Sequence, residues 1–97
     1  MDNFRVIYKI LKYLEATLDC DNPDFDVISA ENLGVTKNRR DRLLIMLQDV
    51  GYISGLMTIV ALDEPGERIY EPIHPNITVR GLEYLNENNI MQRIACK

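Results

Sequence analysis

The stretch that decides the fold lies in the last third of the chain: Asn76-Ile77-Thr78-Val79-Arg80-Gly81-Leu82-Glu83-Tyr84-Leu85-Asn86-Glu87-Asn88. Thr78 is typical of a helix N-cap, because its hydroxyl can accept a hydrogen bond from a backbone N–H of the first turn. Three apolar residues at helical spacing form the predicted inner face of this helix, namely Val79, Leu82 and Leu85. The amphipathic pattern continues more weakly beyond the stretch, so we expect the C-terminal helix over about residues 78–95.

Two β-like segments precede this helix. Residues 52–62 are mostly apolar and rich in β-branched side chains, which favours a strand, and Gly55 within them is typical of a bulge. The turn Glu64-Pro65-Gly66-Glu67 has Pro second and Gly third, which suits type II geometry. The return strand is marked by three apolar residues and an edge proline, namely Ile69, Tyr70, Ile73 and Pro72. These features predict a β-hairpin over about residues 52–73.

The first part of the chain predicts a long helix. Residues 3–18 carry apolar side chains at three- and four-residue steps, which is the pattern of an amphipathic helix. The apolar positions of this helix are Phe4, Ile7, Tyr8, Leu11, Leu14 and Leu18. An acidic loop follows, and the segment Asp26-Val27-Ile28 after it is compatible with a very short strand.

Residues 29–50 predict two helices joined by a tight turn. The first is short, over residues 29–33, and Gly34 is suited to close it in a left-handed conformation. Thr36 is typical of the N-cap of the second, which is expected to end before Gly51. The inner stripe of this second helix is predicted to be Leu43, Leu47 and Val50, flanked by Leu44 and Met46.

The predicted order of elements is helix, short strand, helix, helix, hairpin, helix. Two helices joined by a short turn and followed by a hairpin form a winged helix-turn-helix, an α+β fold in which the hairpin is the wing. A chain of 97 residues suits one domain with a single hydrophobic core. We therefore expect one winged-helix domain over residues 1–97, with the helix-turn-helix at about 29–50.

The amino-acid composition indicates which class of protein this is. Hydrophobic residues make up 46% of the chain and charged residues 27%, as in folded globular domains. No apolar stretch approaches the ~20 residues that span a bilayer. No leader segment precedes the first helix, so we expect a cytoplasmic protein with no membrane partner, in which Cys20 and Cys96 are free thiols. The net charge of −4 disfavours long-range attraction to nucleic acid but allows a local basic site.

Several of these segments also carry the motifs of a known family. The first, Gly51-Tyr52-Ile53-x-Gly55, follows the third helix, and Leu33-Gly34-Val35 precedes that helix. The second, Ile77-Thr78-x-x-Gly81-Leu82-x-Tyr84-Leu85-x-Glu87-Asn88, opens the C-terminal helix. With these motifs nearly the whole chain resembles the YjcQ-like family, small proteins of Gram-positive bacteria and of their phages or prophages. The resemblance implies a winged-helix domain with no known catalytic residues and no established molecular function, for which a phage structural or regulatory role has been suggested.

The residues themselves give little indication of catalysis. The only histidine, His74, precedes a proline at a strand end, where a surface position is more typical than a general base. A zinc site needs about four closely placed ligands, and the chain offers only Cys20, His74 and Cys96 at wide separations. The acidic loop over residues 19–26 lacks the glycine that a calcium-binding loop requires. We therefore expect no enzyme, no catalytic residues, no metal and no cofactor.

Positive charge is concentrated at one place, the start of the third helix. The six residues from 37 to 42 hold four cations and one aspartate, a local charge of +3. Cations are disfavoured at a helix N-terminus by roughly 0.3–1 kcal/mol each, so helix stability does not explain them. In helix-turn-helix proteins this part of the second helix meets base edges and phosphates. The predicted DNA-binding residues are Lys37, Asn38, Arg39, Arg40 and Arg42, with Asn38 or Arg42 at a base edge.

A helical wheel of this helix leaves a second hypothesis open. Arg39 and Arg40 flank the buried stripe, while Arg42 shares the outward face with Asp41 and Asp49, which repel phosphate. The same face would expose Ile45 to a partner protein. The third alternative is a solvated helix whose arginines pair locally.

Two kinds of macromolecular partner therefore follow. The first is double-stranded DNA, bound with an affinity that falls steeply with salt. The alternative is an unidentified protein, bound through an interaction module of phage or prophage origin with an apolar centre. Besides Ile45 and the wing, this alternative uses the tail residues Ile90, Met91 and Ile94, and the same tail is a candidate contact for a homodimer.

Overall fold

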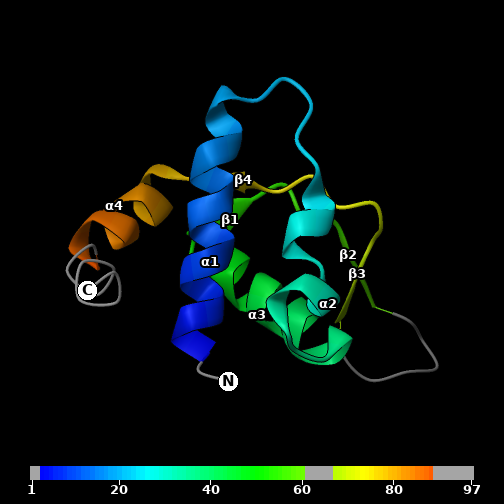
Figure 1. Cartoon of the computed structure of the whole chain (residues 1–97). Helices are drawn as coiled ribbons and strands as arrows, with labels where there is room; N and C mark the ends of the chain where they lie inside the picture. Colours follow the sequence, from blue (N-terminus) through cyan, green and yellow to red (C-terminus); the bar gives the residue numbers. More distant parts are fainter. Residues whose placement is uncertain (1–2, 61–66, 89–97) are drawn as a thin grey trace.

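The computed structural model describes residues 3–60 and 67–88, which form a mixed α+β domain (Figure 1). The elements, in chain order, are α1 (Asn3–Ala16), η1 (Thr17–Asp19), η2 (Phe25–Ile28), α2 (Ala30–Leu33), α3 (Lys37–Asp49), β1 (Ile53–Ser54), β2 (Thr58–Val60), β3 (Glu67–Ile69), β4 (Asn76–Ile77) and α4 (Val79–Glu87). This arrangement of helices and two small antiparallel hairpins matches the predicted α+β class and is compatible with a winged helix. Residues 90–95 of the predicted tail and the predicted wing turn at 64–66 lie outside the described residues.

Helix α1 occupies the centre of the domain, between α4 on one side and η2 with α2 on the other (Figure 1). Its fully buried residues are Val6, Ile10, Leu11 and Leu14. Two of the apolar positions from which the amphipathic helix was predicted do not lie on its buried face, since Phe4 and Leu18 are 65% and 61% exposed. Leu18 lies in the 3₁₀ turn η1, where three residues per turn replace 3.6 and move the side chain off the α-helical stripe. Phe4 lies in the first turn, before the buried stripe begins.

The segment after the acidic loop is helical, so the short strand predicted at residues 26–28 is wrong. The side chain of Asp24 accepts a hydrogen bond from the backbone N–H of Asp26 at 3.0 Å, which starts the 3₁₀ turn η2. The next helix, α2, begins as predicted, because the Ser29 hydroxyl accepts from the N–H of Asn32 at 3.2 Å. It also ends as predicted, with Gly34 at φ 72°.

The strand predicted over residues 52–62 is in fact two short strands in different ladders. β1 pairs with β4, with Ile53 opposite Ile77, while β2 pairs with β3, with Ile59 opposite Arg68. Gly55 separates them at φ 91°, in the left-handed region, as its predicted irregular role requires. The side-chain amide of Gln48 exchanges two hydrogen bonds with the backbone of Leu56, at 2.8 and 3.1 Å, and so replaces a strand partner at the break. The wing in the narrow sense is the β2–β3 hairpin.

Helix α4 begins at the predicted cap, where the Thr78 hydroxyl accepts from the N–H of Gly81 at 3.1 Å. Its inner face differs from the prediction, since Val79 is 71% exposed while Gly81 and Leu85 are buried. Gly81 lies against the backbone of Tyr52 and the side chain of Ile77, so the helix approaches β1 and β4 through its glycine. No helix among the described residues is long and apolar enough to cross a membrane.

Candidate nucleic-acid interface

The start of α3 is fixed by two local signals. Gly34 ends α2 in a left-handed conformation and turns the chain. The Thr36 hydroxyl then accepts a hydrogen bond from the N–H of Arg39 at 3.1 Å and caps α3. Both features were predicted, and together they place the basic residues in the first turns of α3, the second of two consecutive helices.

This N-cap has a measurable contribution to stability. We expect Thr36→Ala to lower the free energy of unfolding by about 1 kcal/mol, because it leaves a donor of the first turn without its partner. Urea unfolding followed by circular dichroism measures the change. Thr36→Ser, which keeps the hydroxyl, should stay close to the wild type. Equal losses in both variants would assign the effect to the threonine methyl group and not to the cap.

Four of the five predicted DNA-binding residues are exposed, namely Lys37, Asn38, Arg39 and Arg42. The guanidinium Nη1 of Arg39 donates to the side-chain oxygen of Asn3 at 3.3 Å, which brings the start of α1 next to the start of α3. The cations on this surface are therefore Lys37, Arg39 and Arg42, and Asn38 lies among them.

Arg40 differs from its neighbours and must be removed from the predicted DNA contacts. Its side chain is 7% exposed, and its Nη1 lies 2.8 Å from a carboxylate oxygen of Asp41 and 3.1 Å from one of Glu71. Its Nε also donates to the backbone oxygen of Ile28 at 3.4 Å. A phosphate group cannot reach a guanidinium that is buried and already holds three acceptors. Arg40 instead joins α3 to η2 and to the segment after β3.

The burial of Arg40 changes the charge of the exposed surface. Asp41 was expected to face outward and repel phosphate, but its side chain is only 20% exposed and its carboxylate is paired with Arg40. The exposed side chains between residues 37 and 42 are therefore three cations and one amide. Asp49, which does repel phosphate, lies at the opposite end of α3.

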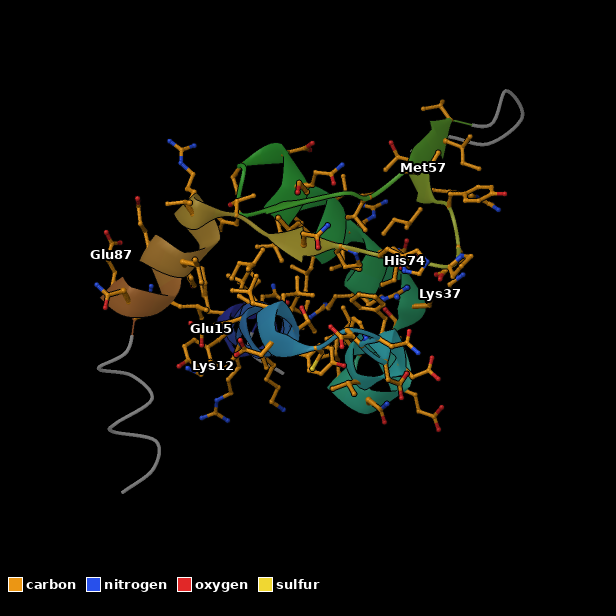
Figure 2. All side chains as sticks on the ribbon, turned by 90° about the horizontal axis from the view of Figure 1, so that it is seen from above. Lys12, Glu15, Lys37, Met57, His74 and Glu87 are labelled. Atoms are coloured by element: carbon orange, nitrogen blue, oxygen red, sulfur yellow. The ribbon has the colours of Figure 1, made fainter. Side chains whose placement is uncertain are left out.

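An acidic cavity limits this surface on one side. It has a volume of about 490 Å³ and lies beside the start of α3, where its lining includes Lys37 and four carboxylates, those of Asp24, Asp26, Glu31 and Glu71. Figure 2 shows Lys37 next to His74 at this end of the molecule. The ring of His74 packs edge-on against Phe25, with 5.7 Å between the ring centroids. Arg39 and Arg42 do not line this cavity, so we expect them to contribute more than Lys37 to any binding of phosphate.

The apolar residues of α3 also differ from the prediction. Leu43, Leu44 and Leu47 are buried, but Val50 is 50% exposed, because Arg40 and not Val50 completes the inner stripe. Ile45 was predicted to face a partner protein, yet it is half-buried and packs against the core. The other residues of that hypothesis, Ile90, Met91 and Ile94, lie outside the described residues.

The wing is part of the predicted protein-interaction alternative, but the apolar residues on the surface of the hairpin were not identified from the sequence. Its exposed large side chains are Met57, Ile59, Val60 and Tyr70, which are 69%, 53%, 69% and 56% exposed. A signal for it was present, since residues 50–62 contain no charged side chain. This uncharged run was interpreted as a strand of the wing without an assignment of its burial, and the structure places Met57, Ile59 and Val60 at the surface.

Groups that could support other chemistries are sparse in the described part of the chain. Among the described residues, no group of three or more His, Cys, Asp or Glu side chains is placed to hold a metal ion. Cys20 is an exposed free thiol, and Cys96 lies outside the described residues.

Comparison with known proteins places the chain in a family. The model of that family, described as YjcQ protein, matches residues 8–96, which is most of the chain and includes every motif on which the resemblance rested. Neither a curated protein nor a solved structure matches it. The chain belongs to the YjcQ family.

Proposed function

We propose that this protein binds double-stranded DNA without catalysis, through the first two turns of α3. The observation that carries the proposal is the set of exposed cations on that helix, Lys37, Arg39 and Arg42, in a helix-turn-helix. In such proteins the N-terminal part of the second helix enters the major groove. Lys37, Arg39 and Arg42 would contact phosphates, and Asn38 or Arg42 would pair with a base edge.

The ion pairs of Arg40 support this function indirectly. They neutralise Asp41, the only acid within the six-residue cluster, so that its carboxylate no longer opposes the attraction between the neighbouring cations and a phosphate. They also hold α3 against the segment after β3, at Glu71, which keeps the helix in one orientation. A rigid support of this kind positions side chains that touch DNA.

The proposal predicts a salt-dependent affinity that charge reversal removes. Fluorescence anisotropy with a labelled duplex of mixed sequence should show micromolar binding at low salt. With three phosphate contacts, the plot of log K against log salt should have a slope of about −2.7. The variant Arg39→Glu/Arg42→Glu should lose binding by at least about tenfold, with a slope smaller in magnitude by about 2.

A matched control separates the site from net charge. Lys9 and Lys12 are exposed on α1, and Lys9→Glu/Lys12→Glu changes the net charge by the same amount as the α3 variant. This control should retain most of the affinity. Equal losses in both double variants would indicate attraction by overall charge and not by α3. Absence of binding by the wild type at tens of micromolar would contradict the proposal.

A second candidate function is supported by the apolar side chains of the hairpin. Wings that bind DNA use cations, whereas Met57, Ile59 and Tyr70 present an apolar surface. Exposed apolar patches mark sites of protein interaction. If the protein does not bind DNA, its function is to bind a protein through this hairpin, with an affinity that tolerates salt.

A further inference from the structure

The β2–β3 hairpin projects from the body of the domain, on the side away from α4 (Figure 2). Its inner strand is β3, which lies against α3 and buries Ile69. Its outer strand is β2, whose three residues are all exposed. Among the described residues β2 pairs only with β3, so its other edge faces outward.

The phase of the ladder determines which backbone groups face that edge. The N–H of Tyr70 donates to the carbonyl oxygen of Met57 at 2.7 Å, so Met57 and Tyr70 form a hydrogen-bonded pair. Hydrogen-bonded and non-hydrogen-bonded pairs alternate along an antiparallel ladder, which makes Ile59 and Arg68 the next hydrogen-bonded pair. The N–H and C=O groups of Thr58 and Val60 therefore point away from β3, toward the outward edge.

The sequence of β2 does not protect this edge. Natural edge strands are protected by Lys, Pro, bulges or other charges that prevent a further strand from pairing. β3 has Glu67 and Arg68, with Pro72 shortly after it, whereas residues 56–62 contain no charge, proline or glycine. A two-stranded hairpin is also marginally stable by itself, and additional strands stabilise it.

We propose that a second copy of this chain occupies the edge, with the two β2 strands antiparallel about a two-fold axis at Ile59. Thr58 of each copy then lies opposite Val60 of the other, and each of these pairs exchanges two hydrogen bonds. This register uses the N–H and C=O groups of Thr58 and Val60, which are the backbone groups that point toward the outward edge. Ile59 lies opposite its symmetry mate in a non-hydrogen-bonded pair, where side chains are closest. The result is a four-stranded sheet and a closed, isologous dimer.

The symmetry favours a second copy over an unrelated strand. A two-fold axis places each residue of β2 opposite a residue of β2 in the other copy. A charged side chain in β2 would therefore face either a like charge or a residue without an opposite charge. Thr58, Ile59 and Val60 carry no charge and are β-branched, as strand pairing favours. Pairing of three-residue strands buries little area, so we expect a weak dimer whose population depends on concentration.

Sedimentation velocity of the full chain from about 10 µM to about 1 mM tests the proposal. The wild type should shift from monomer to dimer across this range. Ile59→Lys and Ile59→Glu place like charges across the axis, and each should weaken dimerisation by about tenfold or more. Because Ile59 is 53% exposed, the monomer should tolerate both changes. An equimolar mixture of the two variants should recover the dimer, because a lysine of one variant then faces a glutamate of the other across the axis.

A backbone variant tests the hydrogen bonds directly. Val60→Pro removes an N–H that faces the edge and is not used in the hairpin, so it should abolish the dimer while circular dichroism stays unchanged. Val60→Thr keeps the N–H and the branched side chain, and should retain the dimer. A wild type that is monomeric up to about 1 mM would overturn the proposal. Dimerisation that is unchanged in Ile59→Lys and Val60→Pro would place the interface elsewhere, and a mixture that stays monomeric would overturn the two-fold register.

Discussion

Replacing Arg40 with alanine is expected to lower the free energy of unfolding by about 3 kcal/mol, one of the two largest effects we predict. The change removes a 94%-buried residue and leaves a cavity between α3, η2 and the segment after β3. It also leaves Asp41 and the carbonyl of Ile28 without their partner. Glu71 is 48% exposed and can return to water, so we place the effect at the lower end of the range for broken buried ion pairs.

Two further variants separate the packing of Arg40 from its charge. Arg40→Met keeps most of the volume and should lose less stability than Arg40→Ala, because apolar replacement of a buried ion is often tolerated. A double-mutant cycle with Glu71→Gln measures the coupling between the two side chains. All free energies come from urea unfolding followed by circular dichroism. An Arg40→Ala variant within about 0.5 kcal/mol of the wild type would show that these contacts do not hold the domain together.

Gly81→Ala is expected to lower the free energy of unfolding by about 2 kcal/mol, and Gly81→Val by more than that. A β-carbon at this position would overlap the carbonyl oxygen of Tyr52 and lie 2.7 Å from Cγ1 of Ile77. Alanine is favoured over glycine within a helix by about 1 kcal/mol, which acts in the opposite direction. The overlap outweighs that gain, because the carbonyl of Tyr52 is held by the N–H of Thr78 at 3.1 Å and cannot move freely.

The same helix offers a control for this prediction. Glu83 is exposed on α4, so Glu83→Ala should change stability by no more than about 0.5 kcal/mol. In thermal unfolding, the midpoint Tm of Gly81→Ala should lie several degrees below the Tm of the wild type and of this control. A Gly81→Ala variant as stable as the wild type would mean that α4 can shift away from β1 without loss.

The starts of α2, α3 and α4 could be predicted because their signals are local, whereas α4 ends at Glu87 and was predicted to continue to about residue 95. Ser29, Thr36 and Thr78 each cap the helix that follows, through a bond to a backbone N–H three residues ahead. Gly34 ends α2 with a positive φ that few other residues adopt. A cap needs only its own few residues, so the surrounding fold does not change it.

The burial of particular side chains could not be predicted in the same way. Periodicity identified the amphipathic character of α1, α3 and α4, yet it placed Val50 and Val79 on the inner faces of their helices, where both are exposed in the structure. The face of a helix that becomes buried depends on where neighbouring elements cross it, and those elements are distant in sequence. At the candidate site, Arg42 is exposed as predicted, but Arg40 is buried, and Ile45, which was predicted to face outward, is half-buried.

The sequence by itself determined the order of the helices, their caps, the basic start of α3 and the family. Only the tertiary structure decided that Arg40 is a buried support, that a long β-like segment divides between two ladders, and that the hairpin exposes its apolar residues. The physical reason is the range of the interactions. Caps and turns satisfy backbone groups within a few residues, whereas Arg40 is held by Glu71, which is 31 positions away, and β1 by the distant strand β4.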